Sequence, residues 1–96
     1  MAPVAKLELG FLPKLAKKAR LRFDRHSGGH MLVYPERGLA LNETAAEIAK
    51  RCDGTRTLAQ IIDELAEGLP AGGHEDVTRD VVAFVEELAQ KGLLER

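Results

Sequence analysis

Residues 35 to 57 read PERGLALNETAAEIAKRCDGTRT, and this stretch decides the fold. Gly38 to Leu41 form a short apolar run with the length of a β-strand. Asn42 follows directly, and its side-chain oxygen can accept a backbone N–H at the start of a helix. The pattern therefore predicts a strand that leads into a helix without a loop.

The helix predicted after Asn42 has one apolar face and ends at a tight turn. Apolar residues at i, i+3, i+4 and i+7 form a single stripe of Ala45, Ile48, Ala49 and Cys52. Asp53 and Gly54 follow, and a glycine there can supply the left-handed conformation that ends a helix. Thr57 and Gln60 have the spacing of a capping box for the next helix. Only residues 53 to 56 then separate the two helices.

A β-hairpin is predicted before this stretch. Ala19 to Asp24 alternate apolar and charged residues, which places Leu21 and Phe23 on one side of a half-buried strand. His26 to Gly29 have the composition of a turn. His30 to Tyr34 are rich in β-forming residues and can pair back antiparallel with the first strand.

A third strand completes the sheet. Pro35 to Gly38 have turn chemistry, with Pro and Gly on either side of a polar pair. Residues 39 to 41 can then return beside His30 to Tyr34. The sequence thus predicts a three-stranded antiparallel meander ahead of the helices.

Two further helices follow the corner. The second is predicted at about Leu58 to Glu67 and the third at about Asp76 to Lys91. Residues 68 to 75, GLPAGGHE, contain three Gly and one Pro and are not expected to stay helical. The expected inward faces are Leu58, Ile61, Ile62, Leu65 and Ala66 on the second helix and Val77, Val81, Phe84, Val85 and Leu88 on the third. Strands followed by helices, βββααα, predict a small α+β domain of the winged-helix type.

The length of 96 residues is that of one small domain. Residues 1 to 12 show no clear period and Pro13 interrupts them, so we expect a flexible N-terminal arm followed by one domain over residues 13 to 96. The chain has three Phe, one Tyr and no Trp, which indicates an aliphatic core and makes base stacking on aromatic side chains improbable.

Charge is distributed unevenly along the chain. Residues 1 to 37 hold eight Lys and Arg against three Asp and Glu, whereas residues 38 to 96 hold six against twelve. Mutual neutralisation of the two halves is favoured over a functional basic patch, because scattered surface charge needs no partner. There is no signal-peptide pattern and no run of eighteen apolar residues. We therefore expect a cytoplasmic protein without a membrane partner.

No catalytic or metal-binding constellation emerges from the residues. His26, His30 and His74 lie in or beside predicted turns without carboxylates at metal-ligand spacing. Cys52 is alone and falls on an apolar stripe, which favours a core position over a nucleophile. Glu86 and Glu87 point to different helix faces, which favours a solvated surface over acid–base catalysis. We expect no catalytic residue, no metal and no cofactor, and interpret the chain as a binding module.

Two kinds of binding module remain. A winged helix suggests DNA, but LAQIIDELAE and DVTRDVVAFVEELAQK in the second and third helices are more acidic than basic and would repel phosphates. The alternative is a peptide that adds as a strand to the sheet edge. Gly38, Leu39 and Ala40 carry no charge that would block this edge, so peptide binding is favoured over nucleic acid.

Several motifs together resemble the PqqD family of pyrroloquinoline quinone (PQQ) biosynthesis over about residues 13 to 95. The strongest part is L-N-x-T-A at Leu41 to Ala45 followed by C-D-G-T-R-T at Cys52 to Thr57. The others are Pro13-Lys14-Leu15, Arg20-Leu21-Arg22, Pro35-Glu36-Arg37, Asp80-Val81-Val82 and Lys91-Gly92-Leu93-Leu94. Arg51, where an apolar residue is expected, is a departure from the family pattern.

The resemblance implies a non-enzymatic peptide chaperone of the kind called a RiPP recognition element. In the family such a domain binds the precursor peptide PqqA and presents it to the radical S-adenosylmethionine enzyme PqqE. Related domains bind the leader of the peptide antiparallel to the third strand and against the third helix. The implied peptide-binding residues are Gly38, Leu39, Ala40, Leu41, Asp76, Arg79, Asp80 and Ala83.

Three further points accompany this expectation. Arg56 at the corner is predicted either to fix the turn or to contact PqqE. A homodimer formed by strand exchange is a further arrangement that the hairpin and the Gly-rich loop allow. A winged-helix DNA-binding regulator is the second-ranked function.

Overall fold

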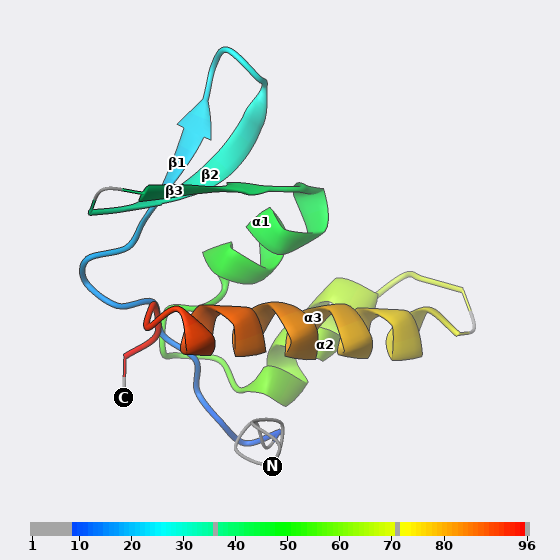
Figure 1. The fold of residues 1–96 in the computed structure, drawn as a ribbon. Coiled ribbons are helices and arrows are strands. Elements are labelled where there is room, and N and C mark those ends of the chain that lie inside the picture. Colours follow the sequence, from blue (N-terminus) through cyan, green and yellow to red (C-terminus); the bar gives the residue numbers. More distant parts are fainter. Residues whose placement is uncertain (1–8, 36, 71, 96) are drawn as a thin grey trace.

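The computed structural model describes residues 9–35, 37–70 and 72–95. Three strands are followed by three helices, as the order of the patterns predicts, and the α+β class is confirmed (Figure 1). The strands are β1 (Arg20–Asp24), β2 (Gly29–Tyr34) and β3 (Arg37–Leu41). The helices are α1 (Glu43–Lys50), α2 (Leu58–Ala66) and α3 (Gly73–Gln90).

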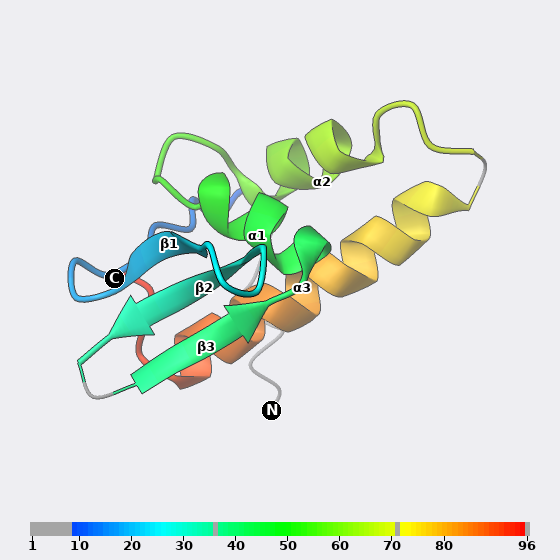
Figure 2. The ribbon, with the colours of Figure 1, turned by 90° about the horizontal axis from the view of Figure 1, so that it is seen from above.

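The strands form an antiparallel sheet in the order β1-β2-β3. Asp24 pairs with Gly29 at one connection, and Tyr34 pairs with Arg37 at the other. The helices lie on one side of the sheet: α3 runs below β3 in Figure 1, and in the view from above its C-terminal half passes behind β2 and β3 (Figure 2). Because β2 is the centre strand, β3 is an edge of the sheet.

The core lies between the sheet and the helices. Leu32 at the centre of β2 is fully buried, and most of the other large buried side chains come from the helices. These are Ile48 from α1, Leu58, Ile61 and Ile62 from α2, and Val81, Val85 and Leu88 from α3, with Leu93 after it. Removal of this aliphatic surface from water is the main force that holds the layers together.

Local capping signals explain where α1 and α2 begin. The Asn42 side-chain oxygen accepts a hydrogen bond from the Ala45 N–H at 2.7 Å. Thr57 and Gln60 form the predicted capping box, in which each side chain accepts from the other residue's backbone N–H. These three hydrogen bonds satisfy backbone N–H groups that have no partner within the first turn of a helix.

The end of α1 differs from the prediction. The helix ends at Lys50, with Arg51 as its C-terminal cap, so the predicted glycine cap is wrong. Gly54 does have a positive φ of 83°, but it serves the N-terminal segment: its N–H donates to the Pro13 carbonyl at 3.0 Å. Lys14 and Asp53 pair beside it as an isolated bridge. The left-handed turn therefore anchors residues 13 and 14 rather than the helix end.

Among the predicted apolar faces, Phe23 is exposed, whereas Ala45 packs against the edge of the core. Ala45 is only half-buried, and its neighbour Ala46 takes the buried place on α1. Helical period alone does not separate adjacent alanines, because both have small side chains near the edge of the apolar stripe. Phe23 is 58% exposed because it lies in the last pair but one of the hairpin, where its ring packs edge-on against His30.

Helix α3 begins at Gly73, three residues before the predicted start at Asp76, so the expectation of a non-helical segment through Glu75 is wrong. Gly72 precedes the helix at a φ of 92°, a conformation that glycine adopts without steric cost. Gly73 lies against Leu69, and a Cβ on it would be 2.7 Å from the Leu69 Cβ. The helix thus starts directly after the left-handed Gly72, at a glycine whose missing side chain leaves room for Leu69.

The N-terminal segment joins the domain before the first strand. The predicted arm of residues 1–12 lies mostly outside the described residues, which begin at residue 9. From there, the carbonyls of Leu9 and Phe11 accept hydrogen bonds from the N–H groups of Ala59 and Leu58 at the start of α2. The segment then runs beside the C-terminal residues, where Leu15 pairs with Leu94. None of the described helices is long and apolar enough to cross a bilayer.

Candidate peptide-binding groove

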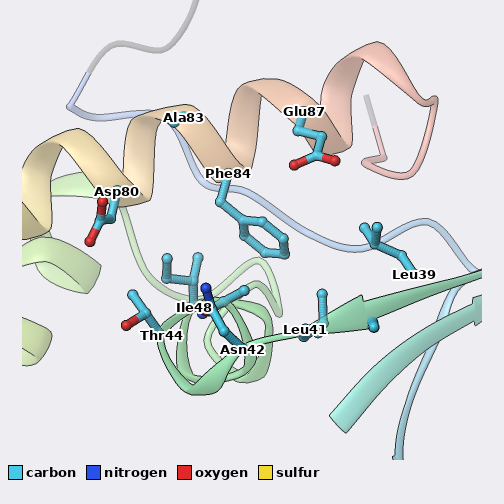
Figure 3. A pocket seen from close by; sticks show the side chains of 11 residues that line it. Leu39, Leu41, Asn42, Thr44, Ile48, Asp80, Ala83, Phe84 and Glu87 are labelled. Atoms are coloured by element: carbon cyan, nitrogen blue, oxygen red, sulfur yellow. The ribbon is translucent and has the colours of Figure 1, made fainter.

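A groove of about 380 Å³ runs between β3 and α3, and we call it the β3–α3 groove (Figure 3). Its lining comes from the end of β3, from α1 and from one face of α3. The lining residues are Leu39, Ala40, Leu41, Asn42, Thr44, Ala45, Ile48, Asp80, Ala83, Phe84 and Glu87. The continuous β3–α1 segment and the distant helix α3 therefore form one binding surface.

The floor of the groove is apolar and its rim is polar. Leu41, Ile48 and Phe84 are buried at the floor, and Leu39 is half-buried beside them. Figure 3 shows Leu39 and Leu41 on the β3 side of the space and the Phe84 ring on the α3 side. Exposed Asp80 and Glu87 line the rim from α3. Such a floor suits apolar side chains of an extended guest.

The β3 edge offers main-chain hydrogen-bonding groups beside this floor. In an antiparallel pair, residues alternate between those that exchange hydrogen bonds with the neighbouring strand and those that do not. Tyr34 and Arg37 are the pair that closes the two-residue connection between β2 and β3, a position at which hairpin pairs exchange hydrogen bonds. By this alternation, we expect the N–H and C=O groups of Gly38 and Ala40 to point away from β2, toward the open edge.

Most predicted peptide-binding residues come together in the structure. Leu39, Ala40, Leu41, Asp80 and Ala83 all line the β3–α3 groove. Their role in peptide binding stays a prediction.

The other three predicted residues lie outside the groove. Gly38 lies on β3 but does not line it, and a Cβ there would be 3.0 Å from the Met31 Cε. Asp76 lines a neighbouring pocket instead, and Arg79 is exposed and forms an ion pair with Asp76.

Sequence reasoning missed several lining residues. Phe84 and Glu87 follow Asp80 and Ala83 at helical spacing, so the period of α3 alone could have indicated them. Thr44 and Ala45 gave no such signal. Their place in the groove depends on how α1 crosses beneath the end of β3, which is set by tertiary packing.

A second pocket of about 540 Å³ lies between α1, the end of α2 and the start of α3, and we call it the helical pocket. Its lining is Glu43, Thr44, Glu47, Leu65, Leu69, Pro70, Gly73, Asp76, Val77 and Asp80. Thr44 and Asp80 line both spaces. The helical pocket therefore adjoins the β3–α3 groove near the C-terminal end of β3.

The corner between α1 and α2 is held by charged side chains. Arg56 donates from Nε to Glu64 Oε2 at 2.9 Å and from a terminal nitrogen to Asp53 at 3.2 Å. Arg51 donates to Glu64 and to Glu47, each at about 3 Å. The hydrogen bond from Arg56 and then that from Arg51 hold the pKa of Glu64 below its usual value.

Both arginines therefore have an identifiable structural role. Arg56 fixes the turn, which is one of its two predicted roles, and its side chain is 37% exposed. Arg51 stands where the family pattern has an apolar residue. Its charge is not buried without a partner, because the guanidinium forms ion pairs with Glu47 and Glu64. The predicted contact of Arg56 with PqqE stays a prediction.

Cys52 and His74, the remaining candidates for catalysis or metal binding, each contact another residue of the fold. Cys52 is buried and its thiol donates to the Ile48 carbonyl at 3.3 Å. Burial, with the nearby negative charge of Asp53, raises the pKa of this thiol to about 12, which suppresses the nucleophilic thiolate. His74 contacts Asp63 at 3.3 Å on the surface. Within residues 9–35, 37–70 and 72–95, no three His, Cys, Asp or Glu side chains cluster as metal ligands.

Comparison with protein families adds an independent line of evidence. Residues 29–94 match the family model described as coenzyme PQQ synthesis protein D (PqqD). A protein of Rhodopseudomonas palustris named PqqA binding protein is 46% identical over 82 residues, covering 85% of this chain and 79% of that protein. A protein of the same name from Xanthomonas oryzae is 43% identical, covering 85% of this chain and 88% of that protein.

Solved structures agree with the family match. The solution structure of the PqqD part of Methylobacterium extorquens PqqCD, described as a stand-alone RiPP recognition element, has a TM-score of 0.79. It is 32% identical, and the match covers 99% of this chain and 100% of that one. The crystal structure of PqqD from Xanthomonas campestris has a TM-score of 0.57 at 35% identity, covering 93% and 98% of the two chains. The chain therefore belongs to the PqqD family of PQQ synthesis proteins.

Proposed function

We propose that this protein is a non-enzymatic chaperone that binds the precursor peptide PqqA by adding it as a strand to the open edge of β3. The observation that carries the proposal is the juxtaposition of this edge with the apolar floor of the β3–α3 groove. Family membership and the name PqqA binding protein of the relatives support the choice of peptide.

The geometry provides both affinity and selectivity. Main-chain groups of a guest strand can pair with those of Gly38 and Ala40, whatever the sequence of the guest. Side chains of a strand alternate between its two faces, so every second guest residue would enter the groove above Leu41 and Phe84. A guest with apolar residues at alternate positions therefore fits the site.

The second candidate, a DNA-binding regulator, is disfavoured by charge. Asp80 and Glu87 line the β3–α3 groove, and none of the described residues that line it is a Lys or Arg. A DNA-binding surface needs cations to neutralise phosphates. Titration of labelled duplex DNA in moderate salt provides the direct comparison with labelled PqqA.

Presentation of the bound peptide to PqqE is part of the proposal. A guest at the β3 edge lies on the outside of the domain, so the parts of PqqA beyond the paired segment stay accessible to an enzyme. Arg56 lies at the α1–α2 corner rather than in the groove lining, and it offers a partly exposed cation for such a contact. Arg56→Gln should then weaken capture of PqqE by the PqqA-bound protein without weakening PqqA binding itself.

The homodimer formed by strand exchange stays a prediction, and edge-to-edge pairing of two copies at β3 is a different arrangement that would use the same edge as the peptide. A second copy paired at β3 would cover the groups that we assign to PqqA. Analytical ultracentrifugation with and without PqqA tests this, because competition for one edge makes PqqA shift any dimer toward the peptide-bound monomer.

The experiment that tests PqqA binding is a proline substitution in β3. Proline has no N–H and fixes φ, so Ala40→Pro removes a main-chain donor at the edge. We expect PqqA to bind at least about tenfold more weakly, a loss of roughly 1.4 kcal/mol. Ala40→Thr keeps the donor at the same exposed position and should lose less. A folded Ala40→Pro protein with unchanged affinity would move the site away from this edge.

A backbone ester separates binding from folding more sharply. Replacing the Ala40 amide by an ester removes one N–H and keeps the side chain. The alternation along β3 predicts that this ester weakens PqqA binding with little effect on the melting temperature. The matched ester at Leu39 should instead lower the melting temperature, because it removes a bond to β2. The reverse pattern would refute the assigned edge.

A further inference from the structure

The helical pocket is larger than the β3–α3 groove and lies next to it, and the proposed strand addition does not use it. Its floor consists of Leu65, Leu69, Pro70 and Val77, and Leu69 is 47% exposed. An exposed apolar floor in a pocket of about 540 Å³ has room for a large side chain of a guest.

The rim of this pocket carries charge of one sign. Glu43, Glu47, Asp76 and Asp80 line it, and no Lys, Arg or His does so in the part of the chain that the structure describes. Glu47 is paired with Lys50 and Arg51, and Asp76 with Arg79. Among the described residues, Glu43 and Asp80 form no ion pair, although the charge of Arg79 acts on Asp80 from nearby. Both carboxylates are exposed and can accept a cation from a guest. Asp80 also lines the β3–α3 groove, which makes the negative charge continuous across both spaces.

From this charge and this floor we infer that the helical pocket is a second subsite for the bound peptide, which takes a segment with a Lys or Arg next to a large apolar side chain. The inference rests on the proposed strand addition at β3. The cation would lie against Glu43 and Asp80, and the apolar side chain would cover Leu69. Charge complementarity and the shared residues Thr44 and Asp80 carry the assignment.

For a guest that pairs antiparallel to β3, the place of the pocket determines the order of the two segments in the peptide. β3 runs from Arg37 to Leu41 and continues through Asn42 into α1, whose Glu43 and Thr44 line the helical pocket. A guest antiparallel to β3 has its N-terminal end at the Leu41 end of the strand. The basic segment should therefore precede the strand-forming segment in the peptide.

The first test changes charge on the protein. Glu43→Gln with Asp80→Asn should weaken binding of fluorescein-labelled PqqA about fivefold at low salt, as expected for loss of two exposed ion pairs. The loss should shrink below about twofold in roughly 0.5 M NaCl, where screening is strong. Asp63→Asn with Glu67→Gln removes an equal number of negative charges from α2 and its C-terminal cap, outside the pocket, and should change affinity less than about twofold. Equal losses in both double variants would overturn the subsite.

The second test changes charge on the peptide. Replacing the Lys and Arg residues before the strand-forming segment of PqqA by Gln should weaken binding to the parent protein and have no further effect on the Glu43→Gln/Asp80→Asn variant. Replacing the Lys and Arg residues after that segment should change the affinity for the parent protein and for the variant by the same factor. Coupling only with the later cations would overturn the antiparallel direction, and absence of any coupling would overturn the subsite.

The third test addresses the apolar floor. Leu69→Ala should weaken PqqA binding about threefold, because it removes a half-exposed contact without opening the core. Leu12→Ala changes a leucine of similar exposure outside the pocket and is the matched control. If both variants bind like the parent while Ala40→Pro does not, the second subsite fails and strand addition stands. If the parent protein does not bind PqqA, both proposals fail.

Discussion

Gly54→Ala is expected to lower the free energy of unfolding by about 2 kcal/mol. The φ of 83° places residue 54 in the left-handed region, where a Cβ costs on the order of 1–2 kcal/mol. The new Cβ would also lie 3.0 Å from the Lys14 Cδ and 3.4 Å from its Cβ and Cγ. Moving this flexible side chain off its rotamer adds up to about 1 kcal/mol.

Thermal unfolding followed by circular dichroism measures the effect. A loss of about 2 kcal/mol corresponds to a fall of roughly 8–16 °C in Tm for a domain of this size. Gly28→Ala is the matched control: its φ is 76°, but nothing lies within 4 Å of the added Cβ, so only the backbone strain remains. Lys14→Ala should recover part of the Gly54→Ala loss. If Gly54→Ala leaves Tm unchanged, the left-handed turn that anchors Pro13 and Lys14 is assigned wrongly.

Three further predictions concern chemistry and charge. The Glu64 pKa is lowered by Arg56 and then by Arg51, so its stabilising contribution is present at neutral pH and is lost as the pH falls through the folded-state value. Urea unfolding of parent and Glu64→Gln should therefore show a stability gap that closes in acid, and a gap that widens would contradict the sign. Cys52, with a thiol pKa of about 12, should resist iodoacetamide at about pH 8 in the folded protein and react after denaturation; rapid labelling of the folded state would disprove its burial. Incubation with PqqA alone should leave the mass of the peptide unchanged, and a mass shift without any enzyme added would end the chaperone proposal.

The element order and two helix starts followed from sequence because their causes are local. Asn42 caps α1, and Thr57 with Gln60 caps α2, through hydrogen bonds to residues three positions away. Such bonds need no tertiary structure, so residue type and spacing are enough to predict them. The order of the three strands is equally predictable from the sequence, because short connections restrict neighbouring strands to antiparallel pairing.

The two errors have different causes. The place of Gly54 depends on its hydrogen bond to the Pro13 carbonyl, forty-one positions away in the chain, which leaves no local pattern in the sequence. At α3, the Gly-rich composition of residues 68 to 75 indicates a loop, whereas the helix already begins at Gly73.

The site, too, is predictable from sequence only where its causes are local. Leu39 to Leu41 were predictable as an open edge, whereas Thr44 and the helical pocket appear only once α1 and α3 are placed against β3.

Hydrogen exchange at the β3 edge tests the central claim most directly. Amide exchange of Gly38 and Ala40 would be followed by NMR in the free protein and at saturation with PqqA. The proposed strand addition predicts that both amides exchange at least about tenfold more slowly in the complex, while Leu39 and Leu41, already paired with β2, change little. Unchanged exchange at Gly38 and Ala40 in a saturated complex would contradict strand addition at β3.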